Sequence, residues 1–557
     1  MTDATLRSSW RGLVRRPRSP RAIAFWLALW LAVVGNLALW RELYRFGGGA
    51  GMLVSAAGAF VIVLAALSAL MLLTAWGRWM KPLWIAILVA AGVAQHFMLT
   101  YGVVMDTAML ANTMQTDPRE VGDLLGWGFA LDVALVALPA VLIVAMPVRR
   151  TLWWPQLWKN AALFALAVVV ALAASFAMFS RLAPLVRNHM HLRYIVNPIA
   201  GFTSAASVAL EPLFKKSTVL VPITAGAALG PSYAGARMPP LIVVVVGETA
   251  RADHFSLNGY ARDTNPELAK TGVFSFRDVR SCGTDTRDSV PCMFSPLAKS
   301  EFERRSGKRE NLLDLLQAVG LAVLWLDNQS GCKDVCARVP TATTADLPAA
   351  DAERLCSGGE CRDEALLVGL DERIAKLPEE RRKRGIVLFL HQMGSHGPAY
   401  SKRSGPTEKR FVPECTDIEL ARCDHDQLVN AYDNSIVATD RMLAATIRWL
   451  QRHAVDHATA LAYMSDHGES LGELGIFLHG LPYRFAPEAQ TRVPYIAWIG
   501  DALAAERGID VACVGRRLDV PQSHDDLYHT VLGLLDVTTP TYDRALDTFA
   551  ACRKKAP

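Results

Sequence analysis

Five long apolar stretches fill the first third of this 557-residue chain and constrain its fold more than any other feature. The hydrocarbon core of a bilayer is about 30 Å thick and a helix rises about 1.5 Å per residue, so each stretch is long enough to cross a membrane. A cleaved signal peptide fits the first stretch poorly, because no small-residue cleavage site follows it and four more stretches do. The predicted spans lie between Arg21 and Arg41, between Arg45 and Arg78, between Lys81 and Asp106, from Leu124 to Val148, and between Lys159 and Arg181.

Basic residues lie on one side of these predicted spans. Six arginines precede the first span, and more basic residues separate spans two and three and spans four and five, whereas the loop between spans three and four is acidic. The positive-inside rule therefore places the N-terminus in the cytoplasm and everything after about residue 181 outside. This orientation explains the basic N-terminus without a nucleic-acid partner. We expect a cytoplasmic N-terminus (1–21), a five-span transmembrane domain (22–180), a membrane-surface bridging segment and linker (181–238) and an extracytoplasmic domain (239–557).

All ten cysteines lie in the predicted extracytoplasmic domain. An even number of cysteines at short spacings in such a location is typical of disulfides. A zinc site is the alternative for Cys332 and Cys336, but no second ligand pair follows at zinc-finger spacing. Cys513 and Cys552 remain as a fifth pair by elimination only. The four predicted close pairs are Cys282 with Cys292, Cys332 with Cys336, Cys356 with Cys361, and Cys415 with Cys423.

Short runs of β-branched and apolar residues alternate with helical patterns after residue 239. Leu241–Val246 and Ile386–Leu390 are too continuously apolar for edge strands, and two further strands end at Asp327 and Asp466. Such runs are typical of parallel strands that are buried on both faces between layers of helices. The sequence therefore predicts an α/β sandwich with a largely parallel sheet, whose ligands bind where the strands end.

Acids and imidazoles follow the predicted strands directly. A single aspartate at a strand end is more often a helix cap, and a single histidine is more often structural. Several together at neighbouring strand ends form a candidate metal site, because zinc accepts both carboxylate oxygen and imidazole nitrogen. The strongest local signal is "SDHGES", which sets two adjacent potential ligands beside Gly468. The candidates are Glu248, Asp327, His391, His396, Asp466 and His467.

The stretch "SCGTDTRDSVPCMF" places hydroxyl groups between Cys282 and Cys292. A metal beside a hydroxyl lowers the pKa of that hydroxyl, which makes it a nucleophile near neutral pH. A disulfide around the loop would fix its position relative to the strand ends. Residue chemistry alone leaves Thr284, Thr286 and Ser289 open as the nucleophile.

Five motifs resemble one known family when they are taken together. "VVVGETARADHFSLNGY", "SCGTDTRDSVPCMFS", "DNQSGCKDVC", "HQMGSHGPAY" and "SDHGESLGELGIFLHGLPY" are similar to the phosphoethanolamine transferases that modify lipid A, including the mobilised colistin-resistance enzymes. The resemblance covers nearly the whole chain. It implies a five-helix transmembrane domain followed by an α/β sandwich domain of the alkaline-phosphatase and sulfatase type.

The resemblance also assigns roles by motif. It implies that Thr286 is the nucleophile and that Glu248, Thr286, Asp466 and His467 bind a tight zinc ion. His396 and His479 match the histidines near the donor phosphate, where a second, weaker zinc could bind. The remaining matched substrate positions are Ser330 and Lys333, with Asn112, Thr116 and Glu120 in the loop between spans three and four.

One departure from the family pattern follows the second threonine. Arg287 and Asp288 stand there, where a small residue is usual. An arginine can bind phosphate with several donors, or it can pair with a neighbouring carboxylate. For Arg287 we expect pairing with Asp285 or Asp288.

The implied reaction is a ping-pong phosphoryl transfer in the bacterial inner membrane. Thr286 would take phosphoethanolamine from phosphatidylethanolamine, and lipid A would then accept it in the periplasm, which lowers surface negative charge and implies polymyxin resistance. We expect a monomer. His396 and His479 both remain open as the group that protonates the leaving alkoxide.

Other functions compete with this one. The acceptor could instead be a core sugar or another envelope glycan. A phosphoglycerol transferase of the lipoteichoic acid synthase kind has similar spans, but the dense cysteine pairs and the C-G-T-x-T string argue against it. A sulfatase is disfavoured because Met293 stands where the sulfatase signature needs arginine. A membrane-anchored sensor without activity is disfavoured by the complete set of ligands.

Overall fold

The computed structural model describes residues 17–46, 52–114, 122, 124–179, 182, 186, 190–214, 220–235, 238–305, 307–357 and 359–554. The chain divides into two compact units. The first comprises residues 1–111 and 124–211, and the second comprises residues 112–123 and 212–557. Each unit is described separately below.

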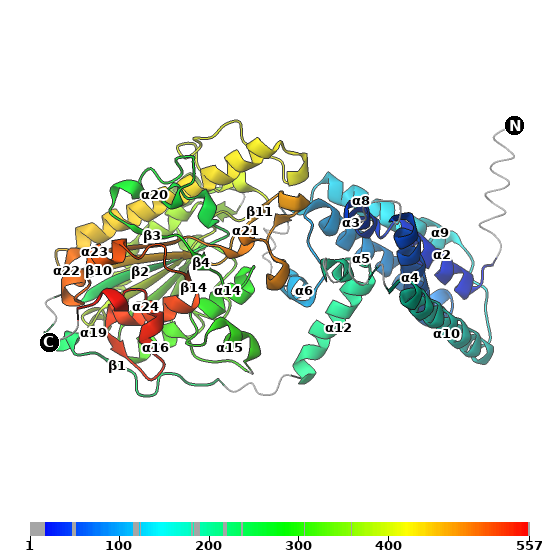
Figure 1. Cartoon of the computed structure of the whole chain (residues 1–557), viewed down its shortest axis with the longest axis horizontal. Helices are drawn as coiled ribbons and strands as arrows, with labels where there is room; N and C mark the ends of the chain where they lie inside the picture. Colours follow the sequence, from blue (N-terminus) through cyan, green and yellow to red (C-terminus); the bar gives the residue numbers. More distant parts are fainter. Residues whose placement is uncertain are drawn as a thin grey trace. The chain divides into compact units, whose positions relative to one another are not determined.

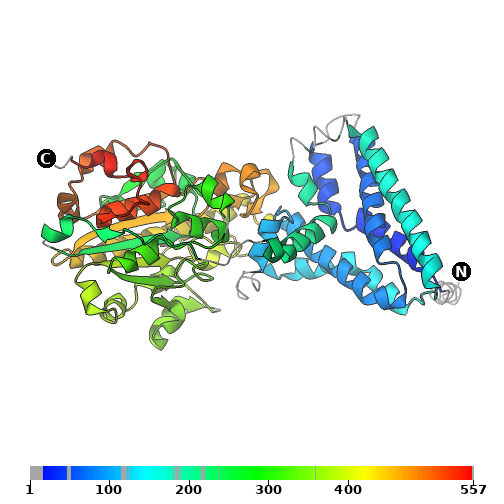
Figure 2. The same ribbon diagram turned by 90° about the horizontal axis from the view of Figure 1, so that it is seen from below.

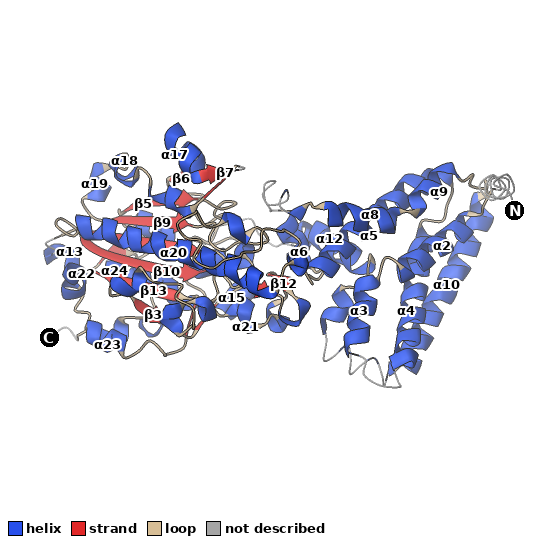
Figure 3. Cartoon of the chain, turned by 90° about the horizontal axis from the view of Figure 1, so that it is seen from above, coloured by secondary structure: helices blue, strands red, loops and turns tan. Residues whose placement is uncertain are grey.

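The first unit is helical. Three of its stretches are long and apolar enough to cross a membrane: α4 (Met52–Leu73), η1 with α5 (Arg78–Met80 and Lys81–Thr100) and α10 (Trp153–Ala177). Two further pairs of helices are bent, α2 (Pro20–Val33) with α3 (Leu37–Phe46) by 41° and α8 (Trp127–Ala137) with α9 (Pro139–Ala145) by 48°. By length and composition the described residues hold three candidate spans, or up to five if each bent pair is one span. Helix α4 packs against both α2 and α10 (Figure 3).

Buried amides stabilise the break between α2 and α3. The Nδ2 of Asn36 donates to the carbonyls of Leu31 and Asn197, at 2.8 and 2.6 Å. The Nδ2 of Asn197 donates in turn to the carbonyls of Gly35 and Ala91, at 2.8 and 2.7 Å. Carbonyls that a helix break releases in an apolar environment need such donors. The same amides tie the segment before α12 (Ile199–Phe214) to the helical bundle.

A seven-stranded sheet forms the centre of the second unit. Its strand order is β3-β13-β10-β2-β9-β5-β6, and β10, β2, β9, β5 and β6 run parallel to their neighbours within that group. Strand β13 is antiparallel to both β10 and β3. The bounds are β2 (Pro240–Gly247), β3 (Phe274–Phe276), β5 (Ala322–Asp327), β6 (Thr341–Thr343), β9 (Ile386–His391), β10 (Ala458–Ser465) and β13 (Tyr495–Ile499). The predicted, largely parallel sheet is confirmed.

Helices cover both faces of this sheet. Alternate side chains of β2 point to opposite faces. Ile242, Val244 and Val246 pack in the core that includes α16 (Leu312–Ala318) and α24 (Asp525–Leu535). The intervening residues pack in the core that includes α20 (His425–His453). Figure 1 shows α20 on one side of the sheet and α16 and α24 on the other, and the red α24 lies over the strands in Figure 2. Burial on both faces explains why the strand sequences are apolar throughout.

Five disulfides stabilise loops of the second unit. They join Cys282 to Cys292, Cys332 to Cys336, Cys356 to Cys361, Cys415 to Cys423, and Cys513 to Cys552. All ten cysteines are paired. The fifth pair, reached by elimination in the sequence, is therefore present as well.

Candidate active site

Two neighbouring central strands bring three potential metal ligands together at their carboxyl ends. Glu248 follows β2 directly, and Asp466 and His467 follow β10, which pairs with β2. One ligand atom from each of the three residues lies within 4.8 Å of the other two. The Nε2 atom of His467 is 3.4 Å from Oε1 of Glu248 and 3.3 Å from Oδ2 of Asp466. All three residues have 0% exposure, so the group is sealed from bulk water.

The side chain of Thr286 joins this group. Thr286 is the first residue of α14 (Thr286–Met293), and its hydroxyl donates to Oε2 of Glu248 at 3.1 Å and lies 3.5 Å from Nε2 of His467. The other two candidate hydroxyls are engaged elsewhere. Thr284 donates to the carbonyl of Leu481 at 2.6 Å, and the Ser289 hydroxyl accepts the amide of Gly283 at 2.9 Å. Of the three hydroxyls in the loop, the structure therefore brings only that of Thr286 to the ligand group.

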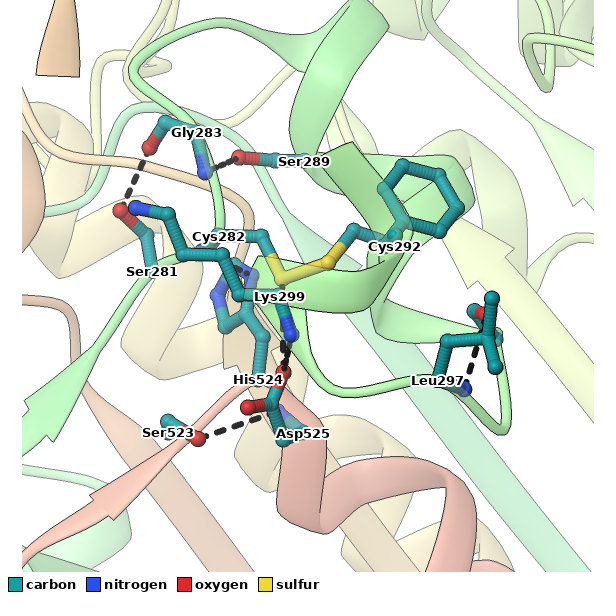
Figure 4. Close-up of a disulfide and its surroundings, with 12 residues drawn as sticks. Ser281, Cys282, Gly283, Ser289, Cys292, Leu297, Lys299, Ser523, His524 and Asp525 are labelled. Carbon is teal, nitrogen blue, oxygen red and sulfur yellow. Dashed lines mark hydrogen bonds between the residues drawn. A yellow bond between two sulfur atoms is a disulfide. The ribbon is translucent and has the colours of Figure 1, made fainter. Parts of the chain in front are cut away.

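A disulfide and a buried histidine hold the loop that carries Thr286 (Figure 4). Cys282 is bonded to Cys292 within α14, which closes the loop. The amide of Cys282 donates to Nδ1 of His524 at 3.0 Å, and Nε2 of His524 is 2.9 Å from the carbonyl of Ser465 at the end of β10. Burial lowers the pKa of His524 to about 4, so the ring is neutral and can accept at Nδ1 while it donates at Nε2. The loop that carries Thr286 is thus connected to the strand that precedes Asp466.

The donor set fits a zinc ion. Oδ1 of Asp466 accepts the amides of Thr249 and His467, at 3.2 and 2.7 Å, while Oδ2 is buried and accepts no hydrogen bond from the described residues. The Nδ1–H of His467 can donate to the carbonyl of Gly468 at 3.0 Å, which leaves the Nε2 lone pair facing the carboxylates. Burial raises the pKa of Asp466 and lowers the pKa of His467. Two buried carboxylates, a neutral imidazole and a hydroxyl are ligands that zinc accepts, and a divalent cation would offset the burial of the negative charge.

Asp327 and His391, which the sequence also offered as ligands, are not part of this group. Oδ2 of Asp327 is 3.2 Å from Nδ1 of His391 and accepts the indole N–H of Trp325 at 2.7 Å. Oδ1 of Asp327 accepts the amide of Gln329 at 2.9 Å, which shapes the loop after β5. Strand register explains the difference, because Asp327 and His391 are direct partners on β5 and β9 and turn to one another. They pair with one another at the ends of their strands, and the charge of His391 partly opposes the rise that burial causes in the pKa of Asp466.

Two further histidines lie beside the ligand group. The ring of His479 is 4.4 Å from that of His467 and 5.3 Å from that of His396, measured between centroids. Nδ1 of His479 is 3.2 Å from Oε1 of Glu469. Burial lowers the pKa of His479, but the charge and hydrogen bond of Glu469 outweigh it and raise that pKa overall. Burial lowers the pKa of His396 well below its usual value. His479 is therefore the better proton donor of the two.

Ser330 and Lys333 reach the site through a residue that the sequence reasoning did not single out. Nε2 of Gln329 donates to Oε2 of Glu248 at 3.1 Å. The hydroxyl of Ser330 donates to Oε1 of Gln329 at 2.5 Å, and Nζ of Lys333 donates to the Ser330 hydroxyl at 2.7 Å. The position of Gln329, directly before the motif serine at a strand end, was the available signal. A chain of hydrogen bonds thus connects Lys333 to Glu248.

The predicted positions in the loop between spans three and four are only partly described. Asn112 lies near the end of α6 (Thr107–Thr113) and is half-buried. Thr116 and Glu120 lie outside the described residues.

The expected pairing of Arg287 does not form. Its side chain makes no ion pair or hydrogen bond with any residue in the described ranges. The carboxylate of Asp285 instead caps α14 by accepting the amide of Asp288 at 2.9 Å. Burial raises the pKa of Asp285 to about 7, and the charges of His479 and Arg287 partly oppose that rise. The Asp285 carboxylate is thus oriented by the helix cap, and Arg287 acts on it only through its charge.

Comparison with known proteins places this chain in a family. A family model described as "Phosphoethanolamine transferase EptA/EptB" matches residues 63–213, and one described as "Sulfatase" matches residues 240–537. The chain is 38% identical to phosphatidylethanolamine transferase Mcr-1 of Escherichia coli over 97% of its own length and 98% of that relative. The chain belongs to the phosphoethanolamine transferase family.

Two more relatives support this membership. The solved structure of the integral membrane protein lipooligosaccharide phosphoethanolamine transferase A (EptA) from Neisseria meningitidis has a TM-score of 0.89 and 32% identity, covering 96% of this chain and 99% of that one. Kdo(2)-lipid A phosphoethanolamine 7''-transferase of Escherichia coli is 27% identical over 93% of this chain and 94% of that relative. This transferase therefore combines a membrane domain with a domain of the sulfatase type.

Gly468 allows a close approach that the ligand group needs. Its backbone φ is not in the left-handed region, so the reason for a glycine is space, and a Cβ would lie 2.0 Å from the carbonyl oxygen of Ala489. We expect Gly468→Ala to lower the free energy of unfolding by at least about 1–3 kcal/mol and to displace Asp466 and His467. Gly515→Ala is the control, because a Cβ there meets nothing within 4 Å. Thermal unfolding and bound-zinc content would measure both effects, and a Gly468→Ala variant as stable as the control would contradict this reading.

Substitution of His391 tests whether a residue near the proposed metal ligands affects zinc affinity. We expect His391→Gln to weaken zinc binding by about 10- to 100-fold, as is typical when a group that supports a ligand is removed. Zinc affinity would be measured by competition with a chelator. The control is His457→Gln, which lies just before β10, at the opposite end of the strand from Asp466. Equal zinc affinities in the two variants would show that His391 supports the fold alone.

Proposed function

We propose that this enzyme transfers phosphoethanolamine from phosphatidylethanolamine to lipid A, with Thr286 as the nucleophile and zinc as the cofactor. The observation that carries the proposal is the convergence of the Thr286 hydroxyl with Glu248, Asp466 and His467 within a buried, disulfide-closed site. The similarity to phosphatidylethanolamine transferase Mcr-1 supports the donor. The similarity to Kdo(2)-lipid A phosphoethanolamine 7''-transferase supports an acceptor molecule that contains lipid A.

In the first half of the reaction, the Thr286 oxygen attacks the phosphorus of the donor. Zinc held by Glu248, Asp466, His467 and Thr286 would act as a Lewis acid that lowers the pKa of the hydroxyl. Glu248 orients the hydroxyl by accepting its hydrogen bond, and the N-terminus of α14 favours negative charge on the oxygen. Oγ1 loses its proton as it bonds to phosphorus, the bond to the diacylglycerol oxygen breaks, and that oxygen takes up a proton, so the half reaction is neutral in protons overall. The raised pKa of His479 suits it to donate this proton.

In the second half, an acceptor oxygen attacks the phosphoethanolamine carried on Thr286. The bond to Oγ1 breaks and the threonine hydroxyl is restored. Lys333 and Ser330 lie on the Glu248 side of the site, where they are suited to bind donor oxygens. By the family resemblance, Asn112, Thr116 and Glu120 would bind the ethanolamine end, with Glu120 as the partner of its ammonium group. His396 and His479 are the candidate ligands of a second, weaker zinc ion.

The proposed function also implies a membrane topology. We propose five spans, with each bent helix pair counted as one, and a cytoplasmic N-terminus (1–21). The transmembrane domain would occupy residues 22–180, a membrane-surface segment residues 181–238, and the periplasmic zinc-dependent domain residues 239–557. The enzyme would act as a monomer in the bacterial inner membrane, and transfer would lower surface negative charge and reduce polymyxin binding.

Replacement of the two loop threonines tests the nucleophile. We expect Thr286→Ala to abolish the covalent phosphoethanolamine adduct and transfer, because no other loop hydroxyl lies at the ligand group. Thr284→Ser keeps the hydroxyl that donates to Leu481 and should retain both activities. Intact-mass measurement and peptide mapping after incubation with phosphatidylethanolamine would locate the adduct. An adduct on Thr284, or persistent transfer by Thr286→Ala, would contradict the proposal.

The acceptor is tested in cells. The rival acceptor is a core sugar, which the 7''-transferase relative makes a specific alternative. We expect lipid A from cells that express the enzyme to gain one phosphoethanolamine unit by mass spectrometry, and cells with the Thr286→Ala variant to show none. An unchanged lipid A with a modified core oligosaccharide would favour the rival.

A further inference from the structure

A half-buried arginine directly follows the proposed nucleophile and has no partner in the described part of the chain. Arg287 is the second residue of α14, next to Thr286. The two acidic neighbours that could neutralise it serve other purposes. Asp285 caps the helix through the amide of Asp288. Asp288 is exposed, and its charge acts on Lys299 and Arg305. The guanidinium of Arg287 is therefore half-buried and makes no hydrogen bond or ion pair with the described residues.

Arg287 and His479 both act electrostatically on one carboxyl next to Thr286. The Asp285 carboxyl is close enough to feel the charges of both Arg287 and His479. His479 in turn lies 4.4 Å from the ring of His467, a proposed metal ligand. Arg287 is thus adjacent in the chain to Thr286, and its charge acts on the same carboxyl as that of His479.

The second half of the reaction creates a need for such a cation. The phosphoethanolamine on Thr286 carries a negative charge, and a phosphate acceptor brings another. Like charges that approach within a few ångströms in a partly desolvated site repel by several kcal/mol. The attack of Thr286 on the donor brings no second phosphate, and a sugar hydroxyl acceptor would bring none either. A positive group beside Thr286 is therefore needed most when the acceptor is itself a phosphate.

We propose that Arg287 forms an acceptor subsite that binds a phosphate monoester and so selects a phosphate group of the acceptor lipid over a sugar hydroxyl. This inference rests on the proposed function. A guanidinium can hold two oxygens of a monoester while the third attacks. That oxygen bonds to the phosphorus on Thr286, and the bond to Oγ1 breaks with its electron pair returning to Oγ1. The acceptor, as its singly protonated monoanion, supplies the proton that restores the hydroxyl.

Separate assays of the two half reactions test the subsite. The full-length enzyme in detergent would be given phosphatidylethanolamine alone, and formation of the Thr286 adduct would be followed by intact mass. Transfer would then be measured to phosphorylated lipid A and to lipid A from which the phosphates have been removed. The variants are Arg287→Gln and Arg287→Lys. Arg304→Gln is the control, because Arg304 is an exposed arginine in the next helix, α15 (Lys299–Arg304).

We expect Arg287→Gln to form the adduct at the unaltered rate but to raise KM for the phosphorylated acceptor by roughly 10- to 100-fold, the range for loss of a charge-assisted hydrogen-bonded pair. The KM of Arg287→Lys should lie between those of the unaltered enzyme and Arg287→Gln. The KM of Arg304→Gln should equal that of the unaltered enzyme. The unaltered enzyme should prefer the phosphorylated acceptor.

Three results would overturn the inference. Slower adduct formation in Arg287→Gln would assign Arg287 to the donor or to the fold. Unchanged transfer to phosphorylated lipid A would show that no acceptor contact exists, as would equal use of the dephosphorylated acceptor by the unaltered enzyme. Absence of any adduct in the unaltered enzyme would instead refute the proposed function itself.

Discussion

The burial of two carboxylates beside one imidazole is the constraint on which the catalytic domain depends. Glu248, Asp466 and His467 are fully buried, and their ligand atoms lie close together. Buried negative charge is strongly unfavourable without a compensating cation. The three residues meet because β2 and β10 are neighbouring strands whose carboxyl ends lie side by side. A bound divalent cation would offset the buried negative charge, and under the proposed function it would activate the nearby hydroxyl of Thr286.

Rigid supports keep the nucleophile in that position. The disulfide between Cys282 and Cys292 closes the loop, and neutral His524 joins its backbone to the end of β10. Asp285 caps the helix that begins at Thr286. The disulfide and the cap fix the loop against its own helix, and His524 connects that loop to β10, so the position of the Thr286 hydroxyl relative to Asp466 is set by the fold.

Sequence patterns predicted much of this arrangement. Apolar runs identified the parallel strands, because burial on both faces leaves few polar positions, and cysteine spacing identified the disulfides. Residue chemistry left Thr284, Thr286 and Ser289 open, and the family resemblance favoured Thr286. The coordinates add the physical reason, because the hydroxyls of Thr284 and Ser289 are bonded to Leu481 and Gly283. The support role of Asp327 and His391 depends on strand register, and the missing partner of Arg287 depends on a helix cap. The spacing of residues along the chain predicts neither the strand register nor the helix cap.

The central claim is that one metal ion joins Thr286 to the three buried ligands. A crystal of the zinc-loaded enzyme, measured on both sides of the zinc absorption edge, tests it most directly. The account predicts a strong anomalous difference peak within coordination distance of Thr286 Oγ1, Glu248, Asp466 and His467. A peak found only between His396 and His479, with none beside Thr286, would contradict it.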